Sequence, residues 1–433
     1  MKKIGLILAL LALPALIFAT GERQAASGTS GGGTLRFAWW GNPTRDERTL
    51  QIVRLFEQKN PGVKIETETS LFAGYWDNLA AQAAAGNLPD VMQQDYAYIE
   101  QYNNRNMLVD LTPFAQRGLI NLSNWSDAAL AGGRLDGKLI GLSLGTNAWG
   151  MEADQGVLQR AGVTINDTSW TWREFEQAAL QIHQRTGVQT MPMNEHYQII
   201  ENLVRYFGAS MYSRDGRSLG FTTNIAALAA LRELLDMHIR LKNAGALYDP
   251  EDGFIQRGVA EVVMVAGKTW NNWNWSNQHV AYVAAANRPL NFFVCPAPAA
   301  TGMKAPFGTY LKPSMLISIL STSKNQELAA RFVDFMANDV DANRILLAER
   351  GVPLPTHILA DLAPRVDPNM RYTFDYITRA TTVSSAINPP DPARAGEARD
   401  AMRPILLNCL IGRIAPEAAV AQMVAAANVI LSR

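Results

Sequence analysis

Hydrophobic and polar residues follow two spacings along the first third of the chain, and the two spacings alternate. Apolar residues recur every three or four positions at Leu50, Val53 and Phe56, which is the spacing of one helix face. Short apolar or alternating runs on either side are typical of strands. The predicted elements are a strand over 34–40, a helix over 45–59, a strand over 63–67, a helix over 74–85 and a strand over 90–94. This order predicts an α/β fold with a parallel, doubly wound opening, whose ligands bind at the carboxyl ends of the strands.

Turn residues separate these elements. The sequence Asn-Pro-Gly at 60–62 ends the first helix. Pro89 disfavours the helical conformation at Leu88, so the second helix cannot continue into the third strand. Asp90 is expected to accept hydrogen bonds at this turn, which is a structural role.

The remainder of the chain is rich in helical periodicity. Helices are predicted over 172–186, 194–208, 224–243, 325–338, 340–350 and 415–432, and strands over 259–266, 290–295 and 315–320. Asn224 and Ser323 are the residue types that cap helix N-termini.

Tryptophan is concentrated at two places. The chain has ten tryptophans. Trp270, Trp273 and Trp275 alternate with asparagines in one short run, and two more are adjacent near the end of the first strand. Flat aromatic faces beside amide donors and acceptors suit a sugar, which has C–H faces and a rim of hydroxyls. A buried aromatic cluster whose asparagines cap a turn explains the run equally well, so both interpretations stay open.

The N-terminus has the composition of a secretory signal peptide. Lys2 and Lys3 precede an apolar run over 4–18, and Ala19 offers a small residue for cleavage. We therefore predict a signal peptide over 1–19 and a flexible leader over 20–33. No cysteine lies near the cleavage site, so the mature protein is expected to be free in the periplasm rather than attached to lipid.

Composition and motifs exclude several classes of function. Basic and acidic residues balance at 39 each, which leaves no basic footprint for nucleic acid. The five histidines are scattered, and no nucleotide-binding or nucleophile motif is present, so neither a cofactor, nor a metal, nor an enzyme activity is predicted. Cys295 and Cys409 lie in apolar stretches and are expected to be buried thiols rather than a disulfide.

Several motifs, in order and spacing, resemble those of one family. They are the aromatic strand end at 37–42, the helix–turn–strand at 55–65, the Gly-x-x-Pro-Asp turn at 85–91, the strand at 137–143 and the Thr-Trp-Arg-Glu-Phe helix start at 171–175. In these segments the chain resembles the bacterial extracellular solute-binding proteins of ABC sugar importers (family 1), which include maltose-binding protein. Arg173 stands where the family pattern has an acidic residue.

The resemblance implies a two-lobed periplasmic-binding-protein fold, type II-like, with a ligand cleft between the lobes. Each lobe would be a sheet flanked by helices, with lobe one over 34–145 and 294–338 and lobe two over 146–293 and 339–433. Crossings would fall near 145–147, 293–296 and 338–339. A bound sugar would close the lobes by a hinge motion, and a monomer would deliver it to permease subunits at the membrane.

The loops that would face such a cleft supply the predicted ligand-binding residues. They are Trp39, Trp40, Arg45, Tyr75, Trp76, Asp95, Asn147, Trp149, Trp270, Trp273, Asn274, Thr309 and Tyr310. Trp125, Trp170 and Trp172 are expected to pack in cores. Two alternatives stay open. A secreted carbohydrate-active enzyme would use two carboxylates, and the same fold would also serve a non-sugar solute such as a peptide.

Overall fold

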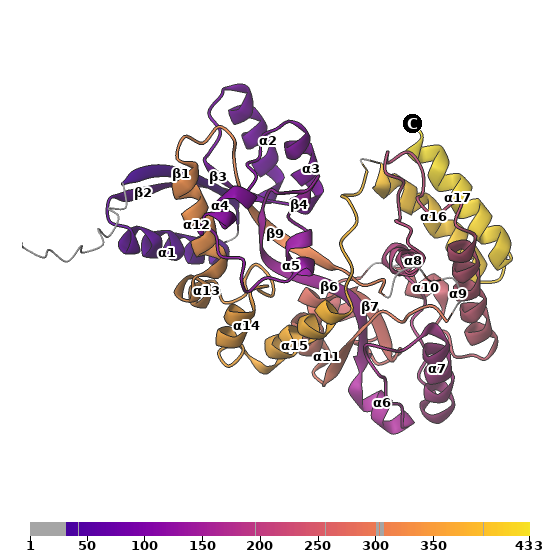
Figure 1. Cartoon of the computed structure of the whole chain (residues 1–433). Helices are drawn as coiled ribbons and strands as arrows, with labels where there is room; N and C mark the ends of the chain where they lie inside the picture. The colour runs from indigo at the N-terminus through magenta and orange to yellow at the C-terminus, as the bar shows by residue number, and fades with distance from the viewer. Residues whose placement is uncertain are drawn as a thin grey trace, which may run out of the picture.

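The computed structural model describes residues 32–41, 43–194, 196–255, 257–299, 303, 307–392 and 394–433. Its elements form two groups, and one long strand, β6 (Leu142–Asp154), runs from one group into the other (Figure 1). Within the described ranges no helix is both long enough and apolar enough to cross a membrane. The predicted signal peptide and nearly all of the predicted leader lie outside these ranges.

Seven strands form one mixed sheet in the order β2-β1-β3-β9-β6-β7, with β8 paired to β6. Strand β1 is parallel to β2 and to β3, which confirms the parallel opening. All pairings of β9 and β6 are antiparallel. The strands are β1 (Gly33–Trp40), β2 (Val63–Ser70), β3 (Val91–Gln94), β6, β7 (Asn271–Trp275), β8 (Leu290–Val294) and β9 (Leu311–Ile319), and a separate hairpin pairs β4 (Arg134–Leu135) with β5 (Lys138–Leu139).

Helices surround both parts of the sheet. In the first group they are α1 (Pro43–Lys59), α2 (Phe72–Ala84), α3 (Tyr96–Asn104), α4 (Thr112–Gln116), α5 (Asp127–Ala131), α12 (Gln326–Asn338) and α13 (Val340–Leu346). In the second group they are α6 (Gln155–Ala161), α7 (Trp172–Thr186), α8 (His196–Arg205), α9 (Ile225–Asn243), α10 (Pro250–Gly253), α11 (His279–Ala286), α16 (Ala395–Leu410) and α17 (Pro416–Leu431), with two 3₁₀ turns, η1 (Val259–Glu261) and η2 (Ser276–Gln278). Between them lie α14 (Thr356–Leu362) and α15 (Pro368–Thr382).

Strand β6 changes partners along its length. Its first half, to Ala148, pairs with β9, and from Trp149 onward it pairs with β7 and β8. The ladder is irregular at Gly145, where a Cβ atom would lie 2.1 Å from the Arg350 carbonyl oxygen. Only glycine fits such a close approach of two backbones. The predicted crossing at 145–147 lies just before this change of partner.

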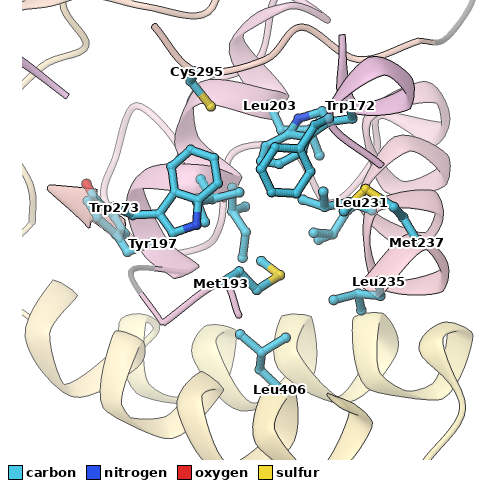
Figure 2. Close-up of a cluster of buried hydrophobic side chains, with 14 of the residues drawn as sticks. Trp172, Met193, Tyr197, Leu203, Leu231, Leu235, Met237, Trp273, Cys295 and Leu406 are labelled. Atoms are coloured by element: carbon cyan, nitrogen blue, oxygen red, sulfur yellow. The ribbon is translucent and has the colours of Figure 1, made fainter. Parts of the chain in front are cut away.

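Two large hydrophobic cores correspond to the two groups. The first includes Phe37, Phe56 and Phe332, packed between the sheet and α1 and α12. The second is built around α7, α8, α9 and α16, and Figure 2 shows some of its side chains, among them Trp172, Leu203 and Leu406. Both cysteines are buried and free, as predicted.

The lobe boundaries given above stay predictions. Helix α13 packs against α1 and α12 of the first group, whereas α15 packs against α11 and β8 of the second. We propose on these contacts that the last crossing lies between α13 and α15 rather than at 338–339.

One predicted strand and one predicted cap are wrong. Residues 259–266 form the 3₁₀ turn η1 and further turns, because Arg288 donates to the carbonyl oxygens of Met264 and Val265, where a strand would have a neighbouring strand. Ser323 donates to the Asp90 carboxylate, and Asn325 occupies the N-cap of α12. Asn224 does cap its helix, accepting from the Ala227 amide.

Candidate functional site

A cavity of 510 Å³ lies in the second group, along the edge strand β7 and between α8 and α16; we call it the aromatic cavity. Its lining comprises Trp149, Met191, Asn194, His196, Tyr197, Gln198, Phe254, Ile255, Arg257, Val262, Val263, Asn272, Trp273, Asn274, Trp275, Gln278, Tyr282, Gly396, Arg399, Asp400 and Arg403. Successive residues of β7 point to opposite faces of the sheet, so Trp273 and Trp275 lie on one face of this edge strand and Asn272 and Asn274 on the other, and the lining includes residues from both faces.

Two stacked indoles form the base of the aromatic cavity. The rings of Trp149 and Trp273 lie 5.4 Å apart between centroids, with 13° between their planes. In the ladder of β6 and β7, Trp149 pairs with Trp275 and Met151 pairs with Trp273. Trp149 and Trp273 are therefore diagonal neighbours on the same face of the sheet. Trp275 is half-buried, and the Lys312 ammonium lies 5.0 Å from the centre of its ring. The wall therefore offers flat apolar surfaces of the kind that sugar rings contact.

Four buried polar atoms of the lining residues have no hydrogen-bond partner among the described residues. They are the Trp273 indole nitrogen Nε1, the His196 ring nitrogen Nδ1 and the amide oxygens Oδ1 of Asn274 and Asn194. Buried polar groups in proteins are nearly always paired, so each unpaired one calls for an explanation. These atoms belong to residues that line one cavity, and hydroxyl groups suit such a mixture of donors and acceptors because they both donate and accept.

A buried carboxylate accepts a hydrogen bond from the amide nitrogen of Asn274. Glu152 on β6 accepts from the Asn274 Nδ2 at 3.4 Å and lies 2.7 Å from the His279 Nδ1. Burial raises the pKa of Glu152, and the hydrogen bond from His279 opposes that rise. These contacts fix the Asn274 amide, so its free oxygen has a set direction.

A second cavity, of 780 Å³, lies where the two groups meet; we call it the junction cavity. The first group contributes α3 and residues 131–136, and the second contributes α8 and residues 210–216. Residues 387–392 form the remaining wall. This cavity is therefore lined from both sides of the molecule.

Three side chains in mutual contact lie between the two cavities. The Tyr197 hydroxyl donates to the Asp391 carboxylate at 2.6 Å, and the Arg399 guanidinium lies 3.2 Å from the same carboxylate. The guanidinium also lies over the Tyr197 ring, 4.3 Å from its centre. Tyr197 and Arg399 line the aromatic cavity, whereas Asp391 lines the junction cavity, so this trio is the wall that they share.

A buried arginine holds the chain that crosses the junction. Arg205 donates to the Gly308 carbonyl, the Ser385 hydroxyl and the Asn388 amide oxygen at 2.6–2.7 Å. From the first group, the Tyr96 hydroxyl donates to the Asn388 carbonyl. Residues 384–392 are thus attached to both groups at once.

Three of the predicted site residues line the aromatic cavity: Trp149, Trp273 and Asn274. Trp270, in the same run, does not. Its ring is fully buried in the second core, and its Nε1 donates to the Thr190 hydroxyl at 2.8 Å. It lies one position before β7 begins, where the chain still pairs with Gln189.

The predicted residues of the first group line neither cavity. The Trp39 indole is fully buried and donates to Asp46 at 2.7 Å. Arg45 forms an ion pair with Glu349 at 2.9 Å. Asp95 caps α3 by accepting from the Ala97 amide. These are structural roles that turn and helix-end residues often have.

The remaining aromatic residues predicted in the first group form a cluster on the other face of the sheet. Trp40 packs against Tyr75 and Trp76, and Trp76 stacks on Tyr98 with 4.0 Å between ring centres. The Tyr75 hydroxyl donates to the backbone carbonyl of Gln93 at 2.7 Å. This cluster lies outside the linings of both cavities.

The predicted residues near the crossing are also absent from both linings. Asn147 pairs with Lys312 in the ladder between β6 and β9. Thr309 is buried and bridges to Ser384. The Tyr310 hydroxyl donates to the buried Glu201 carboxylate at 2.7 Å, beside Arg205. Burial raises the pKa of Glu201.

Other lining residues gave no clear signal in the sequence. Tyr197, Tyr282 and Arg403 come from helices whose periodicity indicates only a core face. Trp275 had a signal, since it belongs to the tryptophan–asparagine run, and Tyr96 follows the third strand.

Comparison with known proteins identifies the family. The sequence model for the bacterial extracellular solute-binding proteins matches residues 33–342. The chain belongs to this family. It is 27% identical to an extracellular solute-binding protein family 1 structure from Alicyclobacillus acidocaldarius, with a TM-score of 0.84 over 93% of this chain and 99% of that one.

Two further relatives have names that state a ligand. An arabinooligosaccharide-binding protein of Bacillus subtilis is 25% identical over 276 residues, and the match spans 61% of this chain and 62% of that protein. A periplasmic oligogalacturonide-binding protein from Yersinia enterocolitica has a TM-score of 0.75 at 18% identity over 93% of this chain and 99% of that one. At that identity the second likeness concerns the fold alone.

Proposed function

We propose that this protein is the exported carbohydrate-binding component of an ABC importer. In this role it captures a sugar, preferably an oligosaccharide, in the periplasm and delivers it to permease subunits without chemical change. Membership of the family supports the general role. The observation that carries the choice of ligand is the lining of the aromatic cavity, which combines the aromatic residues Trp149, Trp273 and Trp275 with four residues that have an unpaired polar atom: Asn194, His196, Trp273 and Asn274.

The position of the two cavities supports a ligand longer than one ring. The aromatic cavity and the junction cavity share one wall, made by Tyr197, Asp391 and Arg399. A chain of sugar units bound at Trp273 would extend toward the junction, where both groups provide side chains. Such a ligand would favour a closed arrangement, because only that arrangement lets both groups contact it.

The make-up of the aromatic cavity favours binding over hydrolysis. Glycoside hydrolysis generally requires two carboxyl groups beside the scissile bond. Among the described lining residues of this cavity, Asp400 is the single carboxylate. Peptide N–H groups also donate to amide oxygens, so the titration below includes a peptide beside the sugars.

Calorimetric titration of the purified protein tests the proposal. The panel contains arabino-, malto- and galacturono-oligosaccharides, their monosaccharides and a neutral tripeptide as the control. We expect at least one oligosaccharide to bind without turnover, more tightly than its monosaccharide, and to make the protein more compact in small-angle scattering. Failure of every sugar to bind would refute the carbohydrate assignment, and release of shorter sugars would favour the enzyme alternative.

A further inference from the structure

Two arginines on one helix face the aromatic cavity. Arg399 and Arg403 are four residues apart on α16, so their side chains lie on the same side of that helix, and both line the cavity. Like charges at this spacing repel each other. A carboxylate beside either guanidinium lowers this repulsion.

The two guanidinium groups differ in how they are paired. Arg399 has the Asp391 carboxylate at 3.2 Å and also donates to the Ala395 carbonyl. Arg403 donates to the Phe254 carbonyl and lies over the ring of that residue. No carboxylate of the described chain comes within 4.0 Å of it. A guanidinium has five N–H donors, so most of those on Arg403 have no protein acceptor.

None of the other charged groups of the described lining forms an ion pair with Arg403. Arg257 is paired with Asp252, which lies outside the lining. Asp400 is exposed and forms no ion pair within 4.0 Å in the described chain. Burial lowers the pKa of His196, which lines the same cavity, and the nearby Arg403 and Arg399 lower it further. Arg403 is therefore the arginine of the described lining that has no carboxylate within 4.0 Å.

We infer that the sugar held in the aromatic cavity carries a carboxylate, as a uronic acid residue does, and that Arg403 binds this carboxylate. The planar fork of a guanidinium matches a carboxylate with two parallel hydrogen bonds. The ring of the acidic sugar contacts Trp275, the half-buried indole of the lining, while its hydroxyls pair with Asn194. This inference rests on the proposed function and narrows its ligand class to acidic oligosaccharides.

Matched ligands that differ only in charge test the inference. Oligogalacturonide is titrated against its methyl ester, and glucuronic acid-substituted xylo-oligosaccharide against the unsubstituted form. We expect each acid to bind at least roughly tenfold more tightly than its neutral partner, since hydrogen bonds to charged groups are the stronger ones. Binding of the acid should weaken as sodium chloride is raised, because salt screens the attraction.

Variants of Arg403 test whether this residue causes the preference for the acidic sugar. In Arg403→Gln the preference for the acid should disappear, while the neutral sugar keeps its affinity. Arg403→Lys keeps the charge without the fork and should restore part of the preference. Arg413→Gln removes an exposed arginine just after α16 and should leave the preference unchanged. A thermal melt of each variant establishes that it is folded.

The possible outcomes distinguish failure of the acidic-sugar inference from failure of the proposed carbohydrate-binding function. If neutral sugars bind as tightly as acidic ones and Arg403→Gln changes neither, the carboxylate is refuted and the carbohydrate assignment survives. If the acids are preferred but Arg403→Gln keeps that preference, the assignment of Arg403 is refuted. If no sugar of either kind binds, both proposals fail.

Discussion

Trp270 and Trp273 lie three residues apart in one run, yet the structure gives them different surroundings. Both rings are almost fully buried, at 0% and 2% exposure. The Trp270 indole N–H donates to Thr190, whereas the Trp273 N–H has no acceptor among the described residues. Both rings pack against Phe175, and Trp273 also stacks on Trp149 and lines the aromatic cavity. Burial therefore does not distinguish these two indoles, but the acceptor of the N–H and the place in the cavity lining do.

Three other tryptophans, Trp39 and Trp125 in the first group and Trp170 in the second, also have paired N–H groups. Trp39 is as buried as Trp270, and its N–H likewise has a protein partner, Asp46. Trp125 donates to Asn338, and Trp170 donates to the Val294 carbonyl. Each of these indoles has a structural explanation that is complete without a ligand.

The largest effect should come from truncating the indole on the core side. Trp270→Ala should lower the free energy of unfolding by about 3–5 kcal/mol, as loss of a buried aromatic side chain does. The folded protein should keep its affinity for sugar. Urea denaturation and calorimetric titration of the same sample measure the two quantities. An unchanged unfolding midpoint together with weakened binding would show that Trp270 contacts the ligand and does not stabilise the core.

A buried histidine of the second group gives a test by pH. Burial lowers the pKa of His238 to about 4, and its Nδ1 donates to the Leu234 carbonyl at 2.8 Å. The unfolded chain then binds a proton between pH values near 6.5 and 4, where the folded chain does not. Stability is therefore complete above about pH 6.5 and falls as the pH drops toward 4, by up to about 3 kcal/mol.

Denaturant melts between these pH values check this dependence in the wild type and in His238→Gln, which has no imidazole to titrate. The slope of stability against pH should flatten in the variant. His357→Gln, at a part-exposed position of α14, is the matched control. Equal slopes in wild type and His238→Gln would contradict the assignment.

A smaller effect is expected from removing the acceptor of the Trp270 N–H. Thr190→Val keeps the side-chain shape but leaves the indole donor buried and unpaired, which costs about 1–3 kcal/mol. Melting of the variant measures the loss, and sugar affinity should stay the same. If stability is unchanged, the hydrogen bond of Trp270 does not explain its position.

The smallest change in stability, with a clear change in binding, is expected at Trp275. This residue is half-buried and lines the aromatic cavity. Trp275→Ala should weaken sugar binding about tenfold or more, equivalent to about 1.4 kcal/mol, through loss of one aromatic face. Its unfolding midpoint should remain near that of the wild type. Trp125→Ala, distant from both cavities, is the control that should lose stability and keep affinity.

Local patterns predicted the elements best where they are regular and long. The first five elements, α7 and α9 follow from hydrophobic spacing and from turn or capping residues, so their positions required no long-range information. The strand prediction over 259–266 was wrong although its apolar residues fit a strand pattern. Arg288, more than twenty residues away in the sequence, donates hydrogen bonds to two backbone carbonyls of this segment. Contacts of that kind cannot be inferred from spacing.

The sequence by itself determined the α/β opening, the helix-rich remainder, the family and the region where aromatic and amide residues concentrate. Only the tertiary structure decided which indole faces a cavity and which completes a core. The reason is that both need the same residue type. What separates them is the acceptor that each N–H meets, and Thr190 and Asp46 are brought to Trp270 and Trp39 by folding. Arg403 illustrates the same limit, since its lack of a carboxylate partner depends on where α16 lies.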